Sequence, residues 1–198
     1  MENLPKKLIK LIEAFQRFPG VGYKSAERMA FTLLEMNVDD LNKFISSVEK
    51  SKEIVRCSSC FNFSDEKYCK ICLDSSREND KICVVSHPKD IIAIEKGSFY
   101  NGQYFVLNKL ISPSKGFLPS DLNIDILINK SNNYKEIILA LNTSLEGETT
   151  SLFLQDLFKD KEIKISVLGY GLPMGSSLEY SDEITIAKSF ENRKEIKK

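Results

Sequence analysis

Two closely spaced pairs of cysteines constrain the fold of this chain more than any other feature. They follow the pattern Cys57-x2-Cys60-x8-Cys69-x2-Cys72. Each pair can present two thiolates to one tetrahedral ion, and the short loop between the pairs lets them meet. Four sulfur ligands leave no open coordination position, so the spacing predicts one structural zinc ion per chain rather than a catalytic metal. A finger this small has almost no core, so we expect the metal to supply its folding energy.

The alternative for these residues is a set of free thiols in a reducing compartment. The chain has five cysteines, an odd number, and its first residues lack the apolar core of a secretory signal, which favours metal over disulfides. Cys83 lies in an apolar run and is expected to be a small buried residue. The apolar runs are far shorter than the ~20 residues of a membrane helix. We therefore expect a cytoplasmic protein without a membrane span.

The N-terminal part, residues 1–55, is expected to form helices. Apolar residues recur there at helical spacing, and Asp39 and Asp40 are placed to cap the third helix. The three apolar sets are Leu4, Leu8, Leu11, Ile12 and Phe15; Ala26, Met29, Ala30 and Leu33; and Leu41, Phe44, Ile45 and Val48.

A glycine turn separates the first two predicted helices. Gly20 and Gly22 allow a tight backbone turn that exposes amide N–H groups at a helix N-terminus, where a phosphate is favoured. Lys24 and Arg28 follow four residues apart and therefore share a helix face. Residues 1–28 carry six basic and three acidic side chains, whereas the whole chain has 28 of each. This pattern is typical of a helix-hairpin-helix, which contacts the DNA backbone without reading bases.

This turn has two other interpretations. An ordinary glycine turn with solvated charges would have the same composition. A nucleotide-binding P-loop requires a glycine directly before its Lys-Ser pair, and Tyr23 occupies that position. Nucleotide binding at this turn is therefore not expected.

From Lys81 onward, predicted strands and helices alternate. Expected strands are 81–85, 104–107, 136–141 and 163–168, and expected helices are 88–96, 122–128 and 149–158, with a last helix from Ser181. Apolar, β-branched strands alternating with helices indicate a mostly parallel sheet covered on both faces. The fold class predicted for the chain is therefore α+β and multi-module.

Acidic residues follow the predicted strand 136–141. Glu146 and Glu148 lie where open parallel sheets place their sites and could hold Mg²⁺. Phosphoryl chemistry usually needs further converging carboxylates, so an acidic surface loop that caps a helix or docks a partner is favoured. Residues 178–183 weakly resemble a Walker B strand, but a surface turn with a helix cap is the simpler reading. His87, the single histidine, is expected to be structural.

Taken in order, these segments resemble the bacterial recombination-mediator RecR family over essentially the whole chain. Besides the four cysteines, the matching segments are residues 18–30 (FPGVGYKSAERMA), 82–85 (ICVV), 111–113 (ISP), 145–148 (LEGE), 170–175 (YGLPMG) and 178–183 (LEYSDE). The resemblance implies a helix-hairpin-helix domain at 1–55, a four-cysteine zinc finger at 56–78, a Toprim domain at 79–172 and a C-terminal Walker-B-like element with a helix at 173–198.

The resemblance also implies a function. The family is not enzymatic in its own right, forms ring-like homotetramers or dimers, and works with RecO and RecF to load RecA on single-stranded DNA coated by SSB protein. By position, Lys24 and Arg28 correspond to its basic contacts with single- and double-stranded DNA, which are independent of base sequence, and the turn formed by Gly20 and Gly22 is expected to bind DNA beside them. The four cysteines correspond to its zinc ligands and Glu146 to its RecO contact. A nucleoid-associated location follows.

The chain departs from the Toprim pattern at two positions. Ser86 stands where the first strand is usually followed by Glu, and Lys115 stands where an acidic residue is usual. Both changes remove negative charge and make Mg²⁺ chemistry less favourable. The alternatives kept open are a Mg²⁺-dependent Toprim nuclease or primase that uses Glu146 and Glu148, and a zinc-finger protein-interaction module without DNA contact.

Overall fold

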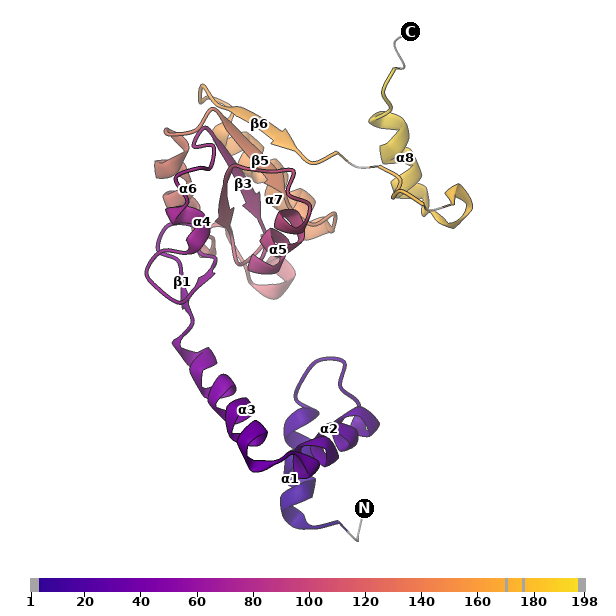
Figure 1. Cartoon of the computed structure of the whole chain (residues 1–198). Coiled ribbons are helices and arrows are strands. Elements are labelled where there is room, and N and C mark those ends of the chain that lie inside the picture. The colour runs from indigo at the N-terminus through magenta and orange to yellow at the C-terminus, as the bar shows by residue number, and fades with distance from the viewer. Residues whose placement is uncertain (1–3, 170, 176, 196–198) are drawn as a thin grey trace. The chain divides into compact units, whose positions relative to one another are not determined.

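The computed structural model describes residues 4–169, 171–175 and 177–195 (Figure 1). Tyr170, which begins one of the segments quoted above, and the charged end at Lys197 and Lys198 lie outside the described residues. The chain separates into two compact units, one ending at Ile54 and the other beginning at Val55. Each unit is described by itself.

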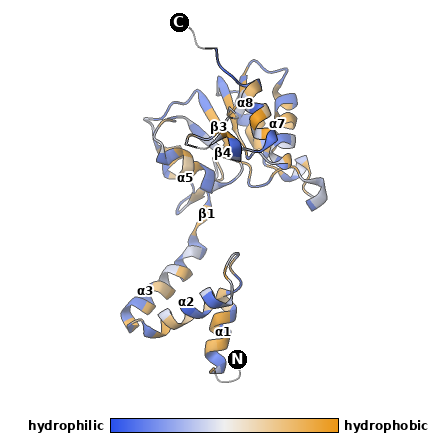
Figure 2. Cartoon of the chain, turned by 90° about the vertical axis from the view of Figure 1, so that its right-hand side faces the viewer, coloured by the Kyte–Doolittle hydropathy of each residue, from blue (hydrophilic) through white to orange (hydrophobic). Residues whose placement is uncertain are grey.

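The first unit consists of helices α1 (Lys6–Phe15), α2 (Tyr23–Glu35) and α3 (Val38–Lys50), followed by a 3-10 turn at Ser51–Glu53. α1 and α2 pack against each other, and the amphipathic pattern of the helices is visible in Figure 2. Their shared core confirms the predicted apolar spacing and contains Leu8, Ile12, Ala26 and Ala30.

The N-cap of α3 differs from the prediction. Asn37, not Asp39 or Asp40, caps the helix, and its side chain accepts a hydrogen bond from the Asp40 N–H at 2.9 Å. An N-cap residue needs an extended backbone, which Asn37 has, whereas both aspartates already lie in the first helical turn. Their carboxylates instead interact favourably with the positive end of the helix dipole.

The second unit is built on a four-stranded sheet with the order β4-β3-β5-β6. All its strands are parallel, as predicted: β3 (Lys81–Val85), β4 (Gln103–Val106), β5 (Glu136–Ala140) and β6 (Lys164–Val167). Figure 1 shows β3, β5 and β6 side by side. Parallel strands meet with their carboxyl ends at one edge, which places the turns after β3 and β5 together.

Helices cover both faces of this sheet. α6 (Ile124–Ser131) and α7 (Leu145–Phe158) pack on one face, in a core that includes Phe105, Leu127 and Leu154. α5 (Pro88–Lys96) packs on the other face through Ile91 and Ile94. This burial confirms the predicted covering of both faces, since β4 is buried along its whole length and β3 at every residue after Lys81.

Helix α7 begins four residues earlier than predicted. The Ser144 hydroxyl caps it by accepting a hydrogen bond from the Gly147 N–H at 3.3 Å. Glu146 and Glu148 therefore lie in the first helical turn rather than in a loop. α6 begins at Ile124, two residues later than the predicted Leu122. A cap such as that of Ser144 decides a helix boundary that apolar periodicity alone leaves uncertain.

The cysteine-bearing segment forms a small finger at the edge of the sheet. Its elements are β1 (Val55–Arg56) paired with β2 (Phe63–Ser64), and the single turn α4 (Lys70–Leu73). The Val106 N–H of β4 donates to the Cys60 carbonyl at 2.9 Å, and the Phe61 ring packs edge-on against Phe105. The finger thus covers the open edge of β4.

The described C-terminal part contains a 3-10 turn at Leu178–Tyr180 and helix α8 (Glu183–Glu191). Asp182 caps α8 by accepting from the Thr185 N–H at 2.9 Å. The surface turn and helix cap predicted for residues 178–183 are therefore confirmed. Further 3-10 turns lie at Pro113–Lys115 and Pro119–Asp121.

A charged network fastens the chain that leaves the finger to the sheet. The Arg77 guanidinium pairs with both carboxylate oxygens of Glu95 on α5 and donates to the Gly102 carbonyl at 3.1 Å. The Tyr104 hydroxyl donates to Glu95 at 2.6 Å. Burial raises the pKa of Glu95, but the hydrogen bonds from Arg77 and Tyr104 outweigh it and hold that pKa below its usual range.

We expect Arg77→Met to lower the free energy of unfolding of the second unit by about 2 kcal/mol at pH 7, because the half-buried Glu95 carboxylate loses its cation and keeps only the hydrogen bond from Tyr104 among its described side-chain partners. Since the folded pKa of Glu95 is lowered, the pair stabilises the protein at neutral pH, and this contribution is lost as the pH falls through that pKa. Urea unfolding at pH 7 and pH 3 should therefore show a difference between the variant and wild type that shrinks in acid.

Lys81→Met provides the matched control for Arg77→Met. Lys81 pairs with Glu78 at 2.9 Å, but both side chains are exposed, and such pairs contribute less than about 1 kcal/mol. Equal destabilisation by the two substitutions would contradict a special role for Arg77.

Candidate metal centre and nucleic-acid interface

The four cysteines of the finger converge on one point. All their sulfur atoms lie within 4.8 Å of one another, with Cys57–Cys72 at 3.8 Å and Cys60–Cys69 at 3.5 Å. Four sulfurs placed about 2.3 Å from a zinc ion at tetrahedral angles would be about 3.8 Å apart. No disulfide joins these cysteines, whose thiols are all free. The cluster can hold one metal ion, as the sequence spacing predicted.

The electrostatics of the cluster also favour a cation. Hydrogen bonds from Cys60 and then Cys72 lower the pKa of Cys69, while the hydrogen bond to Cys69 raises the pKa of Cys60. The cluster therefore readily holds one thiolate but resists ionising a second beside it. A divalent ion at the centre removes that repulsion and lets all four sulfurs coordinate as thiolates.

Cys83 stands apart from this cluster. It lies on β3, is buried against the α5 face of the sheet, and burial raises its pKa to about 12. A thiol in such surroundings is inert and serves as a small apolar residue. The prediction made for Cys83 is confirmed.

The glycine turn before α2 has the geometry of an open elbow. Gly20 has a φ of 80°, a conformation that strains other residues, and no atom lies within 4 Å of a Cβ built at Gly20 or Gly22. Gly22 is the N-cap of α2, and no described side chain caps that end. The first amide N–H groups of α2 therefore lack helical partners and can be approached closely.

Lys24 and Arg28 both lie exposed on α2, just after this elbow. Ala26 and Ala30 of the same helix are buried against α1, so the two cations lie on the side away from that core. Lys24 forms an ion pair with Glu27 at 3.4 Å, which is exposed and therefore weak. Two cations and bare amides at one helix end are suited to a phosphate backbone.

A third cluster lies at the carboxyl edge of the sheet. Lys115 donates to Glu146 at 3.0 Å, and this hydrogen bond is the main reason that the pKa of Glu146 is lowered. Ser86 is fully buried, and its Oγ lacks a hydrogen-bond partner among the described residues. An ammonium group thus occupies the place beside Glu146 where Mg²⁺ would need to bind, so these residues do not fit a Toprim metal site.

The Lys115–Glu146 ion pair was not anticipated from the sequence. From the sequence, Lys115 was identified as a departure from the acidic residue of the Toprim pattern, with no partner predicted for it. It lies 31 positions before Glu146 in the chain. The two meet because the turn after Ile111 and the start of α7 lie at the same edge, where the Ile111 N–H donates to Thr150 at 2.9 Å. The sequence did carry one signal for this pair: Lys115 puts a positive charge at a position where the Toprim pattern usually has an acidic residue.

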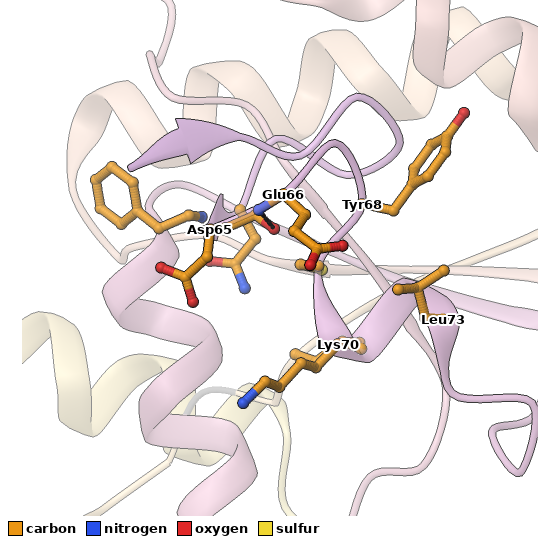
Figure 3. Close-up of a pocket in the computed structure, with 10 residues that line it drawn as sticks. Asp65, Glu66, Tyr68, Lys70 and Leu73 are labelled. Atoms are coloured by element: carbon orange, nitrogen blue, oxygen red, sulfur yellow. Dashed lines mark hydrogen bonds between the residues drawn. The ribbon is translucent and has the colours of Figure 1, made fainter. Parts of the chain in front are cut away.

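The finger also has a surface pocket of about 490 Å³ beside the metal ligands (Figure 3). Figure 3 shows Tyr68 and Leu73 on one side of it and Asp65 on the other. Tyr68 and Leu73 are both exposed, as is Phe63. This pocket adds an apolar surface that the cysteine spacing did not reveal.

Comparisons with known proteins agree with these features. The family models for the RecR helix-hairpin-helix, the Toprim domain and the RecR C-terminal domain match residues 8–51, 80–169 and 171–194. A Natranaerobius thermophilus protein named "Recombination protein RecR" is 41% identical over 199 residues, covering 99% of this chain and 100% of that protein. The chain belongs to the RecR family.

Membership of the RecR family confirms the resemblance and the fold class predicted from the sequence. The RecR helix-hairpin-helix match contains the glycine elbow, and the Toprim match contains the sheet with Glu146. The three matched ranges leave out the four cysteines, for which the geometry given above is the evidence. Within the described residues, no helix is long and apolar enough to span a bilayer.

Proposed function

We propose that this RecR-family chain is a recombinational DNA-repair mediator. It binds single- and double-stranded DNA without reading base sequence and, with RecO and RecF, helps to load RecA on SSB-coated single-stranded DNA. The observation that carries this proposal is the open glycine elbow followed by exposed Lys24 and Arg28. It lies in the segment that matches the RecR helix-hairpin-helix.

Gly20 and Gly22 let the DNA backbone approach, and the two cations neutralise phosphates. One such patch in a chain of zero net charge is weak. Several patches in a homo-oligomeric ring, a tetramer or a dimer, would bind together and gain by multivalency. The proposal retains the division into domains 1–55, 56–78, 79–172 and 173–198.

The metal held by Cys57, Cys60, Cys69 and Cys72 is proposed to be structural zinc. When bound, the ion supplies a rigid tetrahedral crosslink and no reaction step. The four sulfur donors and their spacing support this choice over harder metals, which prefer oxygen ligands. The finger so folded covers the edge of β4 and fixes where the chain enters the sheet.

Glu146 is proposed as the contact for a RecO-type partner, and no enzymatic activity is assigned to the chain. The ion pair with Lys115 supports both statements, because it favours the charged form of the partly exposed Glu146 and places an ammonium group where a metal would bind. The ammonium group and Ser86 together argue against a Mg²⁺-dependent nuclease or primase.

The test is reconstituted RecA loading on SSB-coated single-stranded DNA with a RecO protein. Wild type should raise the rate of RecA's DNA-dependent ATP hydrolysis, and Glu146→Gln should reduce that gain several-fold while DNA binding by the chain itself is unchanged. Asp156→Asn, in the last turn of the same helix and paired with exposed Lys159, is the matched control. Loading no faster with wild type than without it would refute the mediator function.

A second candidate, a protein-interaction module without DNA contact, is favoured only by the exposed apolar pocket of the finger. A gel shift at low salt separates the two. Under this second candidate, wild type would leave DNA unshifted both alone and with the RecO protein.

A further inference from the structure

Lys115 is the outer member of the ion pair that it forms with Glu146 at the carboxyl edge of the sheet. Its Nζ lies 3.0 Å from Glu146 Oε1, and 65% of the lysine side chain is exposed but only 29% of the glutamate side chain. A molecule that approaches this edge therefore meets the positive charge before it meets Glu146.

The turn that carries Lys115 is held in one conformation. Ser112 and Phe117 exchange two backbone hydrogen bonds, at 2.9 and 3.0 Å, and Gly116 between them has a left-handed φ of 74°. The Lys115 N–H itself donates to the Ser112 carbonyl at 3.0 Å. A lysine on so constrained a turn loses less conformational freedom on binding than one on an open loop.

The same turn is tied to the part of α7 that carries Glu146. Thr150 is fully buried, and its Oγ1 accepts from the Ile111 N–H at 2.9 Å and donates to the Glu146 carbonyl at 2.6 Å. Lys115 and Glu146 are thus held near each other through the backbone as well as through their ion pair. Loss of the ion pair alone should leave Lys115 at this edge.

The surface around the ion pair is cationic and partly apolar. Residues 107–120 contain two lysines, Lys109 and Lys115, and no acidic residue. Lys109 is also exposed, and its Nζ lies 4.6 Å from the centre of the Phe117 ring. Leu145, the first residue of α7, has 80% of its surface exposed. This edge therefore offers positive charge beside apolar side chains.

Acidic side chains close to this turn in sequence or space do not cancel its charge. Glu146 is already paired with Lys115. Asp121 accepts a hydrogen bond from the Leu118 N–H at 2.8 Å. Glu148 lies two residues beyond Glu146, and residues at that spacing do not share one side of a helix. The charge left for a partner is therefore positive.

We propose that Lys115 is a specificity-determining residue of this edge, and that it binds an acidic side chain of the protein partner that is flanked by apolar residues. This inference rests on the partner contact proposed above and names the chemistry of the partner's surface. Glu146 then acts from within the ion pair by holding the ammonium group in place. A partner suited to Lys115 should bind poorly to a Toprim edge with the usual acidic residue there, because like charges would face each other.

The direction of the effect of a charge reversal at position 115 tests this proposal. The affinity for a RecO protein is measured by titration calorimetry at low salt. Lys115→Met should weaken binding about 3-fold and Lys115→Glu about 10-fold, because the second substitution also adds repulsion. Both losses should shrink as salt is added. If a basic group of the partner bound Glu146 instead, both substitutions would free that carboxylate and tighten binding, which would overturn the proposal.

A second background separates direct contact by Lys115 from an effect through Glu146. In Glu146→Gln, Lys115 no longer has a carboxylate to pair with among its described contacts. If Lys115 itself contacts the RecO protein, Lys115→Met should still weaken binding by at least about 2-fold in this background. No further loss there would show that the lysine acts only through Glu146, and the proposal would be wrong.

Lys135→Glu is the matched control for the charge reversal. Lys135 is exposed and pairs with an acidic residue, Asp80, at 3.4 Å, but it directly precedes β5 and so lies at the opposite, amino-terminal edge of the sheet. Its reversal should leave the affinity near that of wild type. A loss equal to that of Lys115→Glu would mean that only the net charge of the chain matters.

These outcomes can be separated from failure of the proposed partner contact. Wild type that does not bind the RecO protein would refute that contact and this inference together. Binding that is weakened by Glu146→Gln but unchanged or tightened by Lys115→Glu would refute only the role of Lys115.

Discussion

Removing zinc is expected to unfold residues 55–73 while the parallel sheet stays folded. The finger's buried cluster consists essentially of its own cysteines, so the ion is its main source of stability, on the order of 10 kcal/mol of binding free energy. The sheet has separate apolar cores on its two faces, rich in residues such as Phe105 and Leu139, and does not depend on the ion. Stability should therefore be lost locally.

Hydrogen exchange after chelation at neutral pH measures this loss by segment. Amides of the finger should exchange at least 100-fold faster, and those of β3 and β5 should change little. The Val106 N–H, which donates to Cys60, is the amide of the sheet expected to lose protection. Cys57→Ser should reproduce the chelated state, whereas Cys83→Ser, which changes a thiol outside the cluster, should retain one zinc. Full protection of the finger in Cys57→Ser would contradict a metal-dependent fold.

The second large effect is expected on DNA binding. The double variant Lys24→Ala/Arg28→Ala should bind single- and double-stranded DNA at least 10-fold more weakly at low salt, to a similar degree for every base sequence. Both side chains are exposed on α2 beside the open elbow, and phosphate contacts of this kind carry no sequence information. Each lost contact should also reduce the slope of log K against log salt by about 1.

Fluorescence anisotropy over a salt series measures both quantities. Lys43→Ala/Lys50→Ala removes the same charge from the same unit but from another helix, α3, and should lower affinity much less. Similar losses for the two double variants would mean that only the net charge of the unit matters. An unchanged slope in Lys24→Ala/Arg28→Ala would show that these residues are not phosphate contacts.

Much of the fold could be predicted from local patterns. Helical spacing identified α1, α2 and α3, and apolar β-branched runs identified β3 and β5 close to their observed bounds. For α1, α2 and the strands these predictions succeed because periodicity reflects which face of an element is buried. α3 has the helical spacing as well, although none of its residues is buried in the described structure. Helix starts were less predictable: Asn37 and Ser144 begin α3 and α7 through single hydrogen bonds that depend on local backbone geometry.

The candidate sites contain local parts, which the sequence determined, and distant contacts, which it did not. The four metal ligands lie within one short segment, and so do the residues of the glycine elbow. Because a CxxC turn and a helix start are local structures, the spacing in the sequence was enough to predict which residues meet. Which distant groups adjust those sites was decided only by the tertiary structure. Lys130 on α6 reaches Ser59 because α6 packs on the sheet beside the finger. Lys115 reaches Glu146 because the turn after Ile111 and the start of α7 lie at the same edge of the sheet. Such long-range contacts leave no periodic signal in the sequence.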